Sequence, residues 1–413
     1  MKHFTIRILY ALLFLGNIGC KPIQAKQLKS PTRKCEQCST CTPCAPGVFS
    51  KQGYVNVPDS TINGQFVPSV NIFTRIAGAY VPGKPTIVFL HCLECSGFTF
   101  VAQQQALSAA GYSTIALDLR GRGNSVPKTD PSTFAYTNQA MANDVHTVLV
   151  KLGIQGPIIM VGSVSGGYVV LKYFELFSTP SSSLYDPNRT LSKMSLINSG
   201  PGLTTVPDCA VLPGCTQDGS TCCITSTVCP FPCAGPSCCV CWPFPSVTCT
   251  GYDFFFIPTF SNIAGYTASA CSFSESVFGE PCPADVVQAK LAFAEEFLKT
   301  TGPIQLNLYI NALAEDLRPV IPTIDIPLLV VYGTISPTNS GASIYLHTNV
   351  PGSIIAQFDD IAEQPQITSV SKFNNLLLDF ITDKPLASSI EFPFTGCDVT
   401  PLYKPSRPIP CTP

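Results

Sequence analysis

The segment Val-Gly-Ser-Val-Ser-Gly-Gly at residues 161–167 constrains the fold of this chain more than any other part of it. An apolar strand ends here and a helix begins almost at once. A turn this sharp needs small residues two positions before and two positions after its apex. Gly162 and Gly166 meet that requirement if Val164 is the apex. The chain must therefore contain a tight strand-turn-helix unit.

A second register of the same turn stays open. It places Ser165 at the apex, with Ser163 and Gly167 at the two positions that must be small. Serine at a small position is permissible but less usual, so the glycine spacing favours Val164. The choice matters because a serine can act as a nucleophile, whereas the branched hydrocarbon of valine cannot attack anything.

Strands and helices alternate on both sides of this turn, as expected for βαβ units. Strands are predicted at 54–57, 72–77, 86–90, 113–117, 158–161, 194–197, 328–332 and 354–358. Helices are predicted at 101–110, 139–152, 166–177, 284–299, 310–317 and 370–381. Parallel strands joined by right-handed crossovers give an α/β fold, with a mostly parallel sheet flanked by helices.

Cysteine and charge content point to an exported protein. The chain has 413 residues, of which 21 are cysteine and only 12% are charged, with a net charge of −2. That charge gives no basis for binding nucleic acid. Ten cysteines lie between residues 209 and 249, where no apolar periodicity is found. Such a stretch is typical of a segment held together by disulfides.

The N-terminus supports export. Lys2 and Arg7 flank the start of an apolar run, Ile8 to Leu15, that is too short to span a membrane but suits a signal peptide. Two processing routes stay open: cleavage after Ala25, or lipidation of Cys20 in a lipoprotein-type motif. We expect the mature protein to be secreted, periplasmic or lipid-anchored in the cell envelope. Membrane contact would run only through a lipid on Cys20.

These features divide the chain into six parts. We expect a signal peptide at 1–25 (or a lipoprotein signal at 1–19), a Cys- and Pro-rich leader at 26–50, a first core segment at 51–200, a Cys-rich insertion at 201–312, a second core segment at 313–382 and a Pro-rich tail at 383–413. The insertion would cover one end of the sheet as a cap.

In their order and spacing, four segments resemble the α/β-hydrolase superfamily, in its branch with an inserted cap. They are Leu90-His91 at a strand end, the Asp-Leu-Arg-Gly-Arg-Gly-Asn-Ser stretch at 118–125, the turn at 161–167, and the strand Ile326–Gly333. The resemblance implies an α/β-hydrolase fold with a disulfide-rich cap. It also implies that the turn at 161–167, the elbow, should carry a catalytic serine.

All three positions where the family has its catalytic triad are substituted. Val164 stands at the nucleophile position, Ser336 where the family has its acid, and Glu363 where it has its histidine base. A serine at neutral pH needs an adjacent base, and an ordinary carboxylate is too weak a base unless burial raises its pKa. The resemblance therefore implies the fold while the residues argue against the usual chemistry.

The chain has only four histidines. His3 belongs to the signal segment, and His91 matches a family residue that is usually structural. We expect His146 and His347 to be surface residues. None of the four is placed by the sequence as a base for Ser165.

The loop after the third predicted strand, residues 91–97, corresponds to the family's oxyanion loop. It begins His91-Cys92-Leu93 and reads Cys-x-x-Cys, which fits either a redox pair or structural disulfides. Structural bonds are favoured, either one local disulfide or bonds from the two cysteines to the insertion or the leader. The Cys-x-x-Cys repeats from Cys35 to Cys44 are likewise interpreted as disulfides, not metal ligands. No cofactor and no metal site is predicted.

Three functional hypotheses follow. The first is an exported, catalytically degenerate α/β-hydrolase that binds a small-molecule or protein ligand or acts at the cell surface. The second is an active exported hydrolase for carboxylic esters, esterase- or lipase-like, that uses Ser165. The third is an envelope protein in which leader and tail cysteines join chains into disulfide-linked oligomers.

Overall fold

The computed structural model describes residues 49–127, 133–201, 285–302, 315–336, 340–409 and 411, with short pieces between 270 and 278 and between 304 and 308. The expected export signal, most of the leader and the ten cysteines at 209–249 lie outside the described residues. Among the residues described, no helix combines the length and apolarity needed to cross a membrane.

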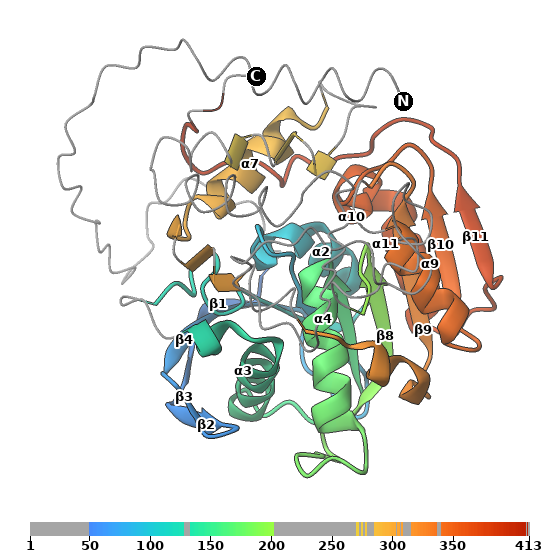
Figure 1. The fold of residues 1–413 in the computed structure, drawn as a ribbon. Helices are drawn as coiled ribbons and strands as arrows, with labels where there is room; N and C mark the ends of the chain where they lie inside the picture. Colours follow the sequence, from blue (N-terminus) through green and yellow to red (C-terminus); the bar gives the residue numbers. More distant parts are fainter. Residues whose placement is uncertain are drawn as a thin grey trace, which may run out of the picture. The chain divides into compact units, whose positions relative to one another are not determined.

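A nine-stranded sheet forms the centre of the described fold (Figure 1). Its strands, in spatial order, are β1 (Lys51–Val57), β4 (Val70–Ala77), β6 (Ser113–Leu117), β5 (Thr86–Leu90), β7 (Ile158–Ser163), β8 (Leu191–Ile197), β9 (Leu328–Gly333), β10 (Ile354–Phe358) and β11 (Ser389–Phe392). Neighbours from β6 to β11 pair in parallel, while β4 pairs antiparallel with β6 and β1. A separate hairpin joins β2 (Ser60–Ile62) to β3 (Gln65–Val67). The predicted α/β fold with a mostly parallel sheet is confirmed.

Helices cover both faces of the sheet. They are α2 (Val101–Ala109), α3 (Asn138–Lys151), α4 (Ser165–Tyr173), α7 (Val287–Phe297), α9 (Ser340–Asn349), α10 (Pro365–Thr368) and α11 (Val370–Ile381). Short 3-10 helices are η2 (Gly97–Phe100), η3 (Thr133–Tyr136) and η6 (Arg318–Thr323), and a π-helical turn, η4 (Phe174–Ser178), extends α4.

Side chains alternate along each strand, so the central strands contribute to two apolar cores. Val88 and Leu90 of β5 pack in the core shared with α3, α4 and α9. Ile87 and Phe89 pack in the core shared with α2 and α11. Because both faces are covered, nearly every position of these strands is buried and most are apolar, which explains the short apolar runs in the sequence.

Several elements differ from prediction, among them the hairpin of β2 and β3 and the short helix α10, which are not predicted. The helix predicted at 310–317 lies largely outside the described residues, but residues 315–317 are not helical and the 3-10 helix η6 follows them. Pro319 and Pro322 lie in the segment that follows and limit it to this short 3-10 helix, because proline within an α-helix removes a hydrogen bond and clashes with the preceding turn. Strand β11 is not predicted at all.

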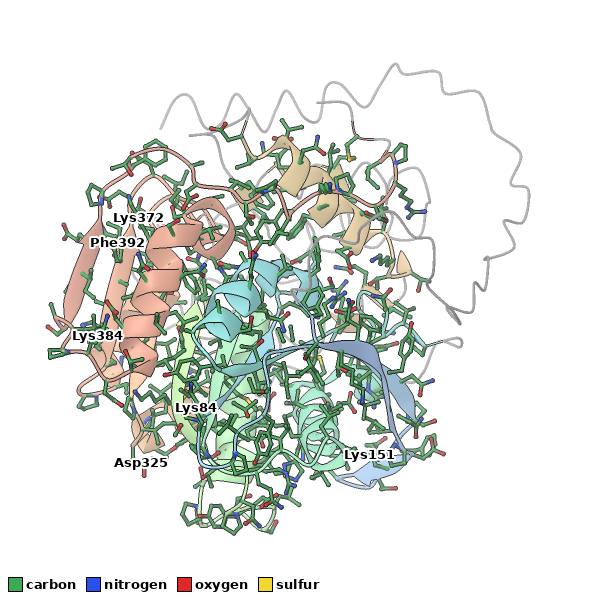
Figure 2. The ribbon with its side chains drawn as sticks, turned by 180° about the vertical axis from the view of Figure 1, so that it is seen from behind. Lys84, Lys151, Asp325, Lys372, Lys384 and Phe392 are labelled. Carbon is green, nitrogen blue, oxygen red and sulfur yellow. A yellow bond between two sulfur atoms is a disulfide. The ribbon has the colours of Figure 1, made fainter. Side chains whose placement is uncertain are left out.

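Strand β11 lies in the segment expected to be only a Pro-rich tail. It pairs in parallel with β10, and Phe392 stacks on Phe358 with ring centroids 4.6 Å apart. Beside it, the Lys372 ammonium on α11 donates to the Pro393 carbonyl at 2.7 Å, and Figure 2 labels Lys372 and Phe392 close together. Four residues between prolines are too few for a periodic signal in the sequence.

The tail also crosses the described part of the cap. Cys411 forms a disulfide with Cys271, and Glu295 of α7 accepts a hydrogen bond from the Ser406 backbone N–H at 2.6 Å. The buried Tyr403 hydroxyl donates to the Thr99 carbonyl at 2.8 Å. The tail is therefore tied to α7 on one side and to η2 on the other. Cys397 is disulfide-bonded as well, so both tail cysteines are engaged within this chain.

A buried ion pair holds α3 against the loop after β6. The Arg120 guanidinium donates to both carboxylate oxygens of Asp144, at 2.6 and 2.8 Å, with the two side chains 2% and 4% exposed. We predict that Asp144→Ala lowers the free energy of unfolding by about 3–5 kcal/mol, because it leaves a buried charge without a partner. Urea denaturation measures this.

The matched control is Asp379→Ala. Asp379 pairs with Lys384 at 2.5 Å near the end of α11, where the two side chains are 33% and 62% exposed (Figure 2 labels Lys384). Exposed pairs contribute about 0–1 kcal/mol, so this variant should stay close to the unmodified protein. Equal losses from the two substitutions would contradict the assignment of Arg120–Asp144 as the pair that stabilises this region.

Candidate functional site

The order of the strands indicates where a site is expected. In the sheet, β5 lies between β6 and β7. The order of the strands therefore reverses at β5, and the loops that follow β5 and β7 lead away from each other. In open parallel sheets, ligands bind in the crevice that this reversal creates at the carboxyl ends of the strands. Here those two loops are the oxyanion loop, residues 91–97, and the elbow at Val164.

The elbow has the geometry of a strained apex. Val164 follows the last residue of β7 and precedes Ser165, the first residue of α4, and its backbone has φ 51° and ψ −116°. Positive φ is rare in any residue with a Cβ and is an outlier for a β-branched one. The apex is Val164, the residue that the glycine spacing favours. Ser165 instead lies in the first turn of α4 and is buried.

Glycines make this turn possible. A Cβ on Gly166 would come within 2.2 Å of the Leu90 carbonyl oxygen, and one on Gly162 would come within 2.6 Å of the Gly167 Cα. A Cβ on Gly167 would lie 2.1 Å from the Ser199 hydroxyl oxygen. All three separations are too short for real Cβ contacts, so α4 can approach the sheet this closely only with glycine at these positions.

Hydrogen bonds from the loop after β8 hold the apex. The Val164 backbone N–H donates to the Ile197 carbonyl at 2.8 Å, and the Ser199 hydroxyl donates to the Val164 carbonyl, also at 2.8 Å. The next residue of that loop, Asn198, also has positive φ, at 44°. These hydrogen bonds hold the strained backbone of Val164 in place, and a strained conformation persists only when its surroundings hold it.

The apex side chain packs among apolar groups. Val164 is partly buried against a cluster from the oxyanion loop, the described part of the cap, α7 and α10, whose members include Cys92, Cys95, Val277, Phe278, Phe293 and Ile367. The position that would face a substrate in a hydrolase is therefore part of a hydrophobic contact between core and cap.

The other two positions that the resemblance marks as substituted, Ser336 and Glu363, lie in loops after β9 and β10. Ser336 is buried, and its hydroxyl oxygen has no hydrogen-bond partner among the described residues. Glu363 uses its backbone: its N–H donates to the Val277 carbonyl at 3.0 Å, and its carbonyl accepts from the Asn198 side chain at 2.9 Å. These bonds join the loop after β10 to the cap and to the loop after β8.

The Glu363 carboxylate acts electrostatically on α4. Burial raises the pKa of Tyr168, one turn after the apex, and the negative charge of Glu363 raises it further. The structure therefore brings the base position near the elbow helix. A carboxylate at that position lacks the basicity of an imidazole at neutral pH unless its own pKa is raised.

The three histidines in the described part of the chain all have other partners. The Leu119 backbone N–H donates to His91 Nε2 at 2.9 Å, so Nδ1 carries the proton and donates to the Cys92 carbonyl at 2.7 Å. His146 stacks on Phe177 with ring centroids 4.0 Å apart, and His347 Nδ1 lies 3.0 Å from the Ser353 hydroxyl. None of them has a hydrogen bond to the Ser165 side chain.

The oxyanion loop contains a local disulfide between Cys92 and Cys95, one of the pairings that the sequence predicted. The Cys95 backbone N–H also donates to the Cys92 carbonyl at 3.2 Å, closing a tight turn. Leu93 is buried in the core on the α3–α4 face of the sheet. Glycines are the usual residues here in the family that the chain resembles, so a disulfide-closed turn stands in their place.

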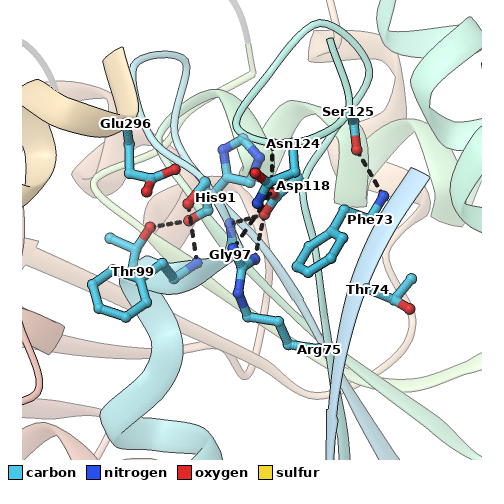
Figure 3. Close-up of polar contacts among 12 residues, drawn as sticks. Phe73, Thr74, Arg75, His91, Gly97, Thr99, Asp118, Asn124, Ser125 and Glu296 are labelled. Carbon is cyan, nitrogen blue, oxygen red and sulfur yellow. Dashed lines mark hydrogen bonds and ion pairs between the residues drawn. The ribbon is translucent and has the colours of Figure 1, made fainter. Parts of the chain in front are cut away.

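Next to this loop lies a buried carboxylate, Asp118, that accepts several hydrogen bonds; we call it the Asp118 hub. The sequence did not predict this role for it. The Asp118 carboxylate accepts hydrogen bonds from the Arg75 guanidinium, from the Gly97 backbone N–H at 2.8 Å and from the Asn124 backbone N–H at 2.9 Å (Figure 3). Burial alone would raise the pKa of Asp118, but the Arg75 charge holds it below its usual value. Asp118 thus fixes the start of η2 and the 118–125 loop together. The 118–125 motif was the signal that could have revealed it.

Comparisons with known proteins agree with this fold. A family model described as the alpha/beta hydrolase fold matches residues 85–185. The esterase EaEST from Exiguobacterium antarcticum superposes with a TM-score of 0.56 at 20% identity, covering 76% of this chain and 96% of the esterase. A bromoperoxidase from Bacillus anthracis gives 0.57 at 21% identity, covering 80% and 100%.

Two curated relatives match over a shorter stretch. The carbamate hydrolase candidate RutD of Cronobacter turicensis is 34% identical over 118 residues, which is 29% of this chain and 42% of RutD. The non-heme chloroperoxidase CPO-A1 of Kitasatospora aureofaciens is 33% identical over 85 residues, which is 21% of this chain and 29% of that enzyme. The chain thus spans less than half the length of either relative.

The sheet order, the elbow and the matching segment define an α/β-hydrolase fold. Residues 85–185 are similar to members of the α/β-hydrolase superfamily, and the described chain has the fold of that superfamily.

The buried His91 makes a testable contribution to stability. Burial lowers its pKa from 6.5 to about 4 in the folded protein, so in this interval the unfolded chain takes up a proton that the folded one does not. His91 therefore contributes stability above pH 6.5 that is lost as the pH falls toward 4, roughly 3 kcal/mol in all.

We predict that His91→Gln, although less stable overall, shows a shallower fall in the free energy of unfolding between pH 7 and pH 4.5. Urea titrations at pH 7, 5.5 and 4.5 provide the measurement, and carboxylates that titrate in this range affect both proteins alike. Identical pH slopes for the two proteins would show that His91 does not stay neutral in the fold.

Proposed function

We propose that this protein is an exported, non-catalytic member of the α/β-hydrolase superfamily that acts by binding a ligand. One observation carries the proposal: the apex of the elbow is Val164, and its side chain packs into the apolar contact between core and cap. A hydrocarbon at that position supplies no nucleophile. The enclosing cluster also leaves the apex without the open polar surroundings that an attacking group and its base require.

Two further features support loss of catalysis. Ser336 offers a hydroxyl where a carboxylate would orient a base, and each described histidine is engaged elsewhere. Similarity to the superfamily does not restore the activity, because one fold supports many functions and the chemistry depends on the site. The names of the relatives, esterase, carbamate hydrolase and peroxidase, therefore do not transfer to this chain.

Export is part of the proposal. It rests on the signal-like apolar run at Ile8–Leu15 and on the cysteine content, and disulfides such as Cys92–Cys95 and Cys271–Cys411 persist in oxidising compartments. Secretion, a periplasmic location and anchoring through a lipid on Cys20 all fit these features.

Fluorophosphonate labelling separates the non-catalytic proposal from an active serine hydrolase. These reagents modify a serine that a nearby base has activated. We predict no labelling of the unmodified protein above that of a heat-denatured sample, detected by mass spectrometry of the intact chain. Labelling that persists in Ser163→Ala and disappears in Ser165→Ala would overturn the proposal in favour of an esterase-like enzyme that uses Ser165.

Val164→Ser extends this test. The variant places a hydroxyl at the strained apex while the positions of Ser336 and Glu363 stay unchanged. We expect no labelling here either, because the apex serine still lacks an imidazole base. Strong labelling of this single variant would mean that a functional base is present and that only the nucleophile has been lost.

A non-reducing gel tests the disulfide-linked envelope hypothesis. Because Cys397 and Cys411 are bonded within the chain, links between chains would have to use other cysteines, such as those of the leader. We predict that protein purified under oxidising conditions, with free thiols blocked by alkylation, migrates as a monomer. Bands of higher molecular mass that disappear when the sample is reduced would support crosslinked oligomers instead.

A further inference from the structure

A hollow lies between η2 and α7, where the tail crosses them. Its walls include Phe98 and Thr99 of η2, Phe293 and Glu296 of α7, and Tyr403 of the tail. The enclosed space is only about 20 Å³, and the hollow is partly open to solvent. This size admits one water-sized group such as an ammonium, while the rest of a ligand would lie toward the open side.

The single charged residue among the lining residues is Glu296. One carboxylate oxygen accepts from the Lys299 ammonium at 2.6 Å. The other oxygen, Oε2, is buried and has no hydrogen-bond donor in the described part of the chain. Figure 3 shows the Glu296 side chain reaching from α7 toward the start of η2, on the side of Thr99. A buried carboxylate oxygen without a donor is costly, so the hollow favours a ligand that brings one.

The aromatic residues add a second preference. Phe98 and Tyr403 lie nearly perpendicular, with ring centroids 6.0 Å apart, and Phe293 packs edge-on against Phe278 at 5.8 Å. Ring faces carry negative electrostatic potential and attract cations. No Lys or Arg is among the lining residues, although the Lys299 ammonium pairs with the other oxygen of Glu296.

We propose that this hollow binds the primary ammonium group of a small alkylamine. One N–H would donate to Glu296 Oε2, and the alkyl chain would lie against Phe98 and Phe293. The inference rests on the binding function proposed above and names its ligand class. An anion would be repelled by the Glu296 carboxylate. A quaternary ammonium has the charge but no N–H for Oε2, and a neutral alcohol has a donor but no charge.

The test is isothermal titration of the unmodified protein at pH 7 with n-propylammonium chloride, with tetramethylammonium chloride and 1-propanol as comparison ligands. We expect propylammonium to bind and the other two to bind at least tenfold more weakly. Glu296→Gln keeps the side-chain shape and removes its charge, and should weaken propylammonium binding about 10- to 100-fold, the range for a lost charge-assisted hydrogen bond.

Glu275→Gln is the matched control. Glu275 is also in the cap and pairs with the Lys290 ammonium at 2.5 Å, but its side chain is 61% exposed and it does not line the hollow. The substitution changes the net charge by the same amount as Glu296→Gln. Propylammonium affinity should therefore be unchanged in this variant.

Several results would overturn the inference. They are no binding of propylammonium by the unmodified protein, equal losses in Glu296→Gln and Glu275→Gln, or affinity for tetramethylammonium or 1-propanol that matches propylammonium. None of these results depends on catalysis. Fluorophosphonate labelling, by contrast, would overturn the non-catalytic proposal whatever the titration shows, so the two failures can be told apart.

Discussion

The approach of α4 to the sheet is the contact on which the rest of the structure depends. At Gly166 the helix lies so close to the Leu90 carbonyl that a single methyl group would not fit. This fixes where α4 begins and sets the backbone of the residue before it, so Val164 has positive φ whatever its side chain. The shape of the elbow is therefore encoded in its glycines. The turn therefore keeps its shape with valine at the apex.

The hydrogen bonds of Asp118 likewise stabilise the fold without requiring any catalytic activity. Its carboxylate joins β4, η2 and the 118–125 loop through Arg75, Gly97 and Asn124. The same motif supplies Arg120, which holds α3, and Ser125, whose hydroxyl accepts from the Phe73 backbone N–H at 2.8 Å. A segment that resembles an enzyme family this strongly can thus be retained for the interactions it makes within the fold. Sequence similarity over 85–185 reports on the scaffold more than on activity.

The sequence predicted what depends on local pattern. The central strands were predictable because both faces are buried, and the elbow because its glycine spacing reflects a steric limit. Strand β11 was not, since four residues flanked by prolines carry no period. The hollow at Glu296 could not be predicted either. Its walls come from η2, α7 and Tyr403, which are far apart in sequence and are brought together by tertiary contacts alone.

The disulfide between Cys271 and Cys411 has a consequence for how the protein is made. It joins residues 140 positions apart, a span that in the chain-entropy model contributes roughly 5 kcal/mol by restricting the unfolded chain. During synthesis, however, Cys271 emerges long before its partner. In that interval the cap lacks this bond to the tail. Correct pairing of Cys271 therefore depends on a segment of chain that arrives late.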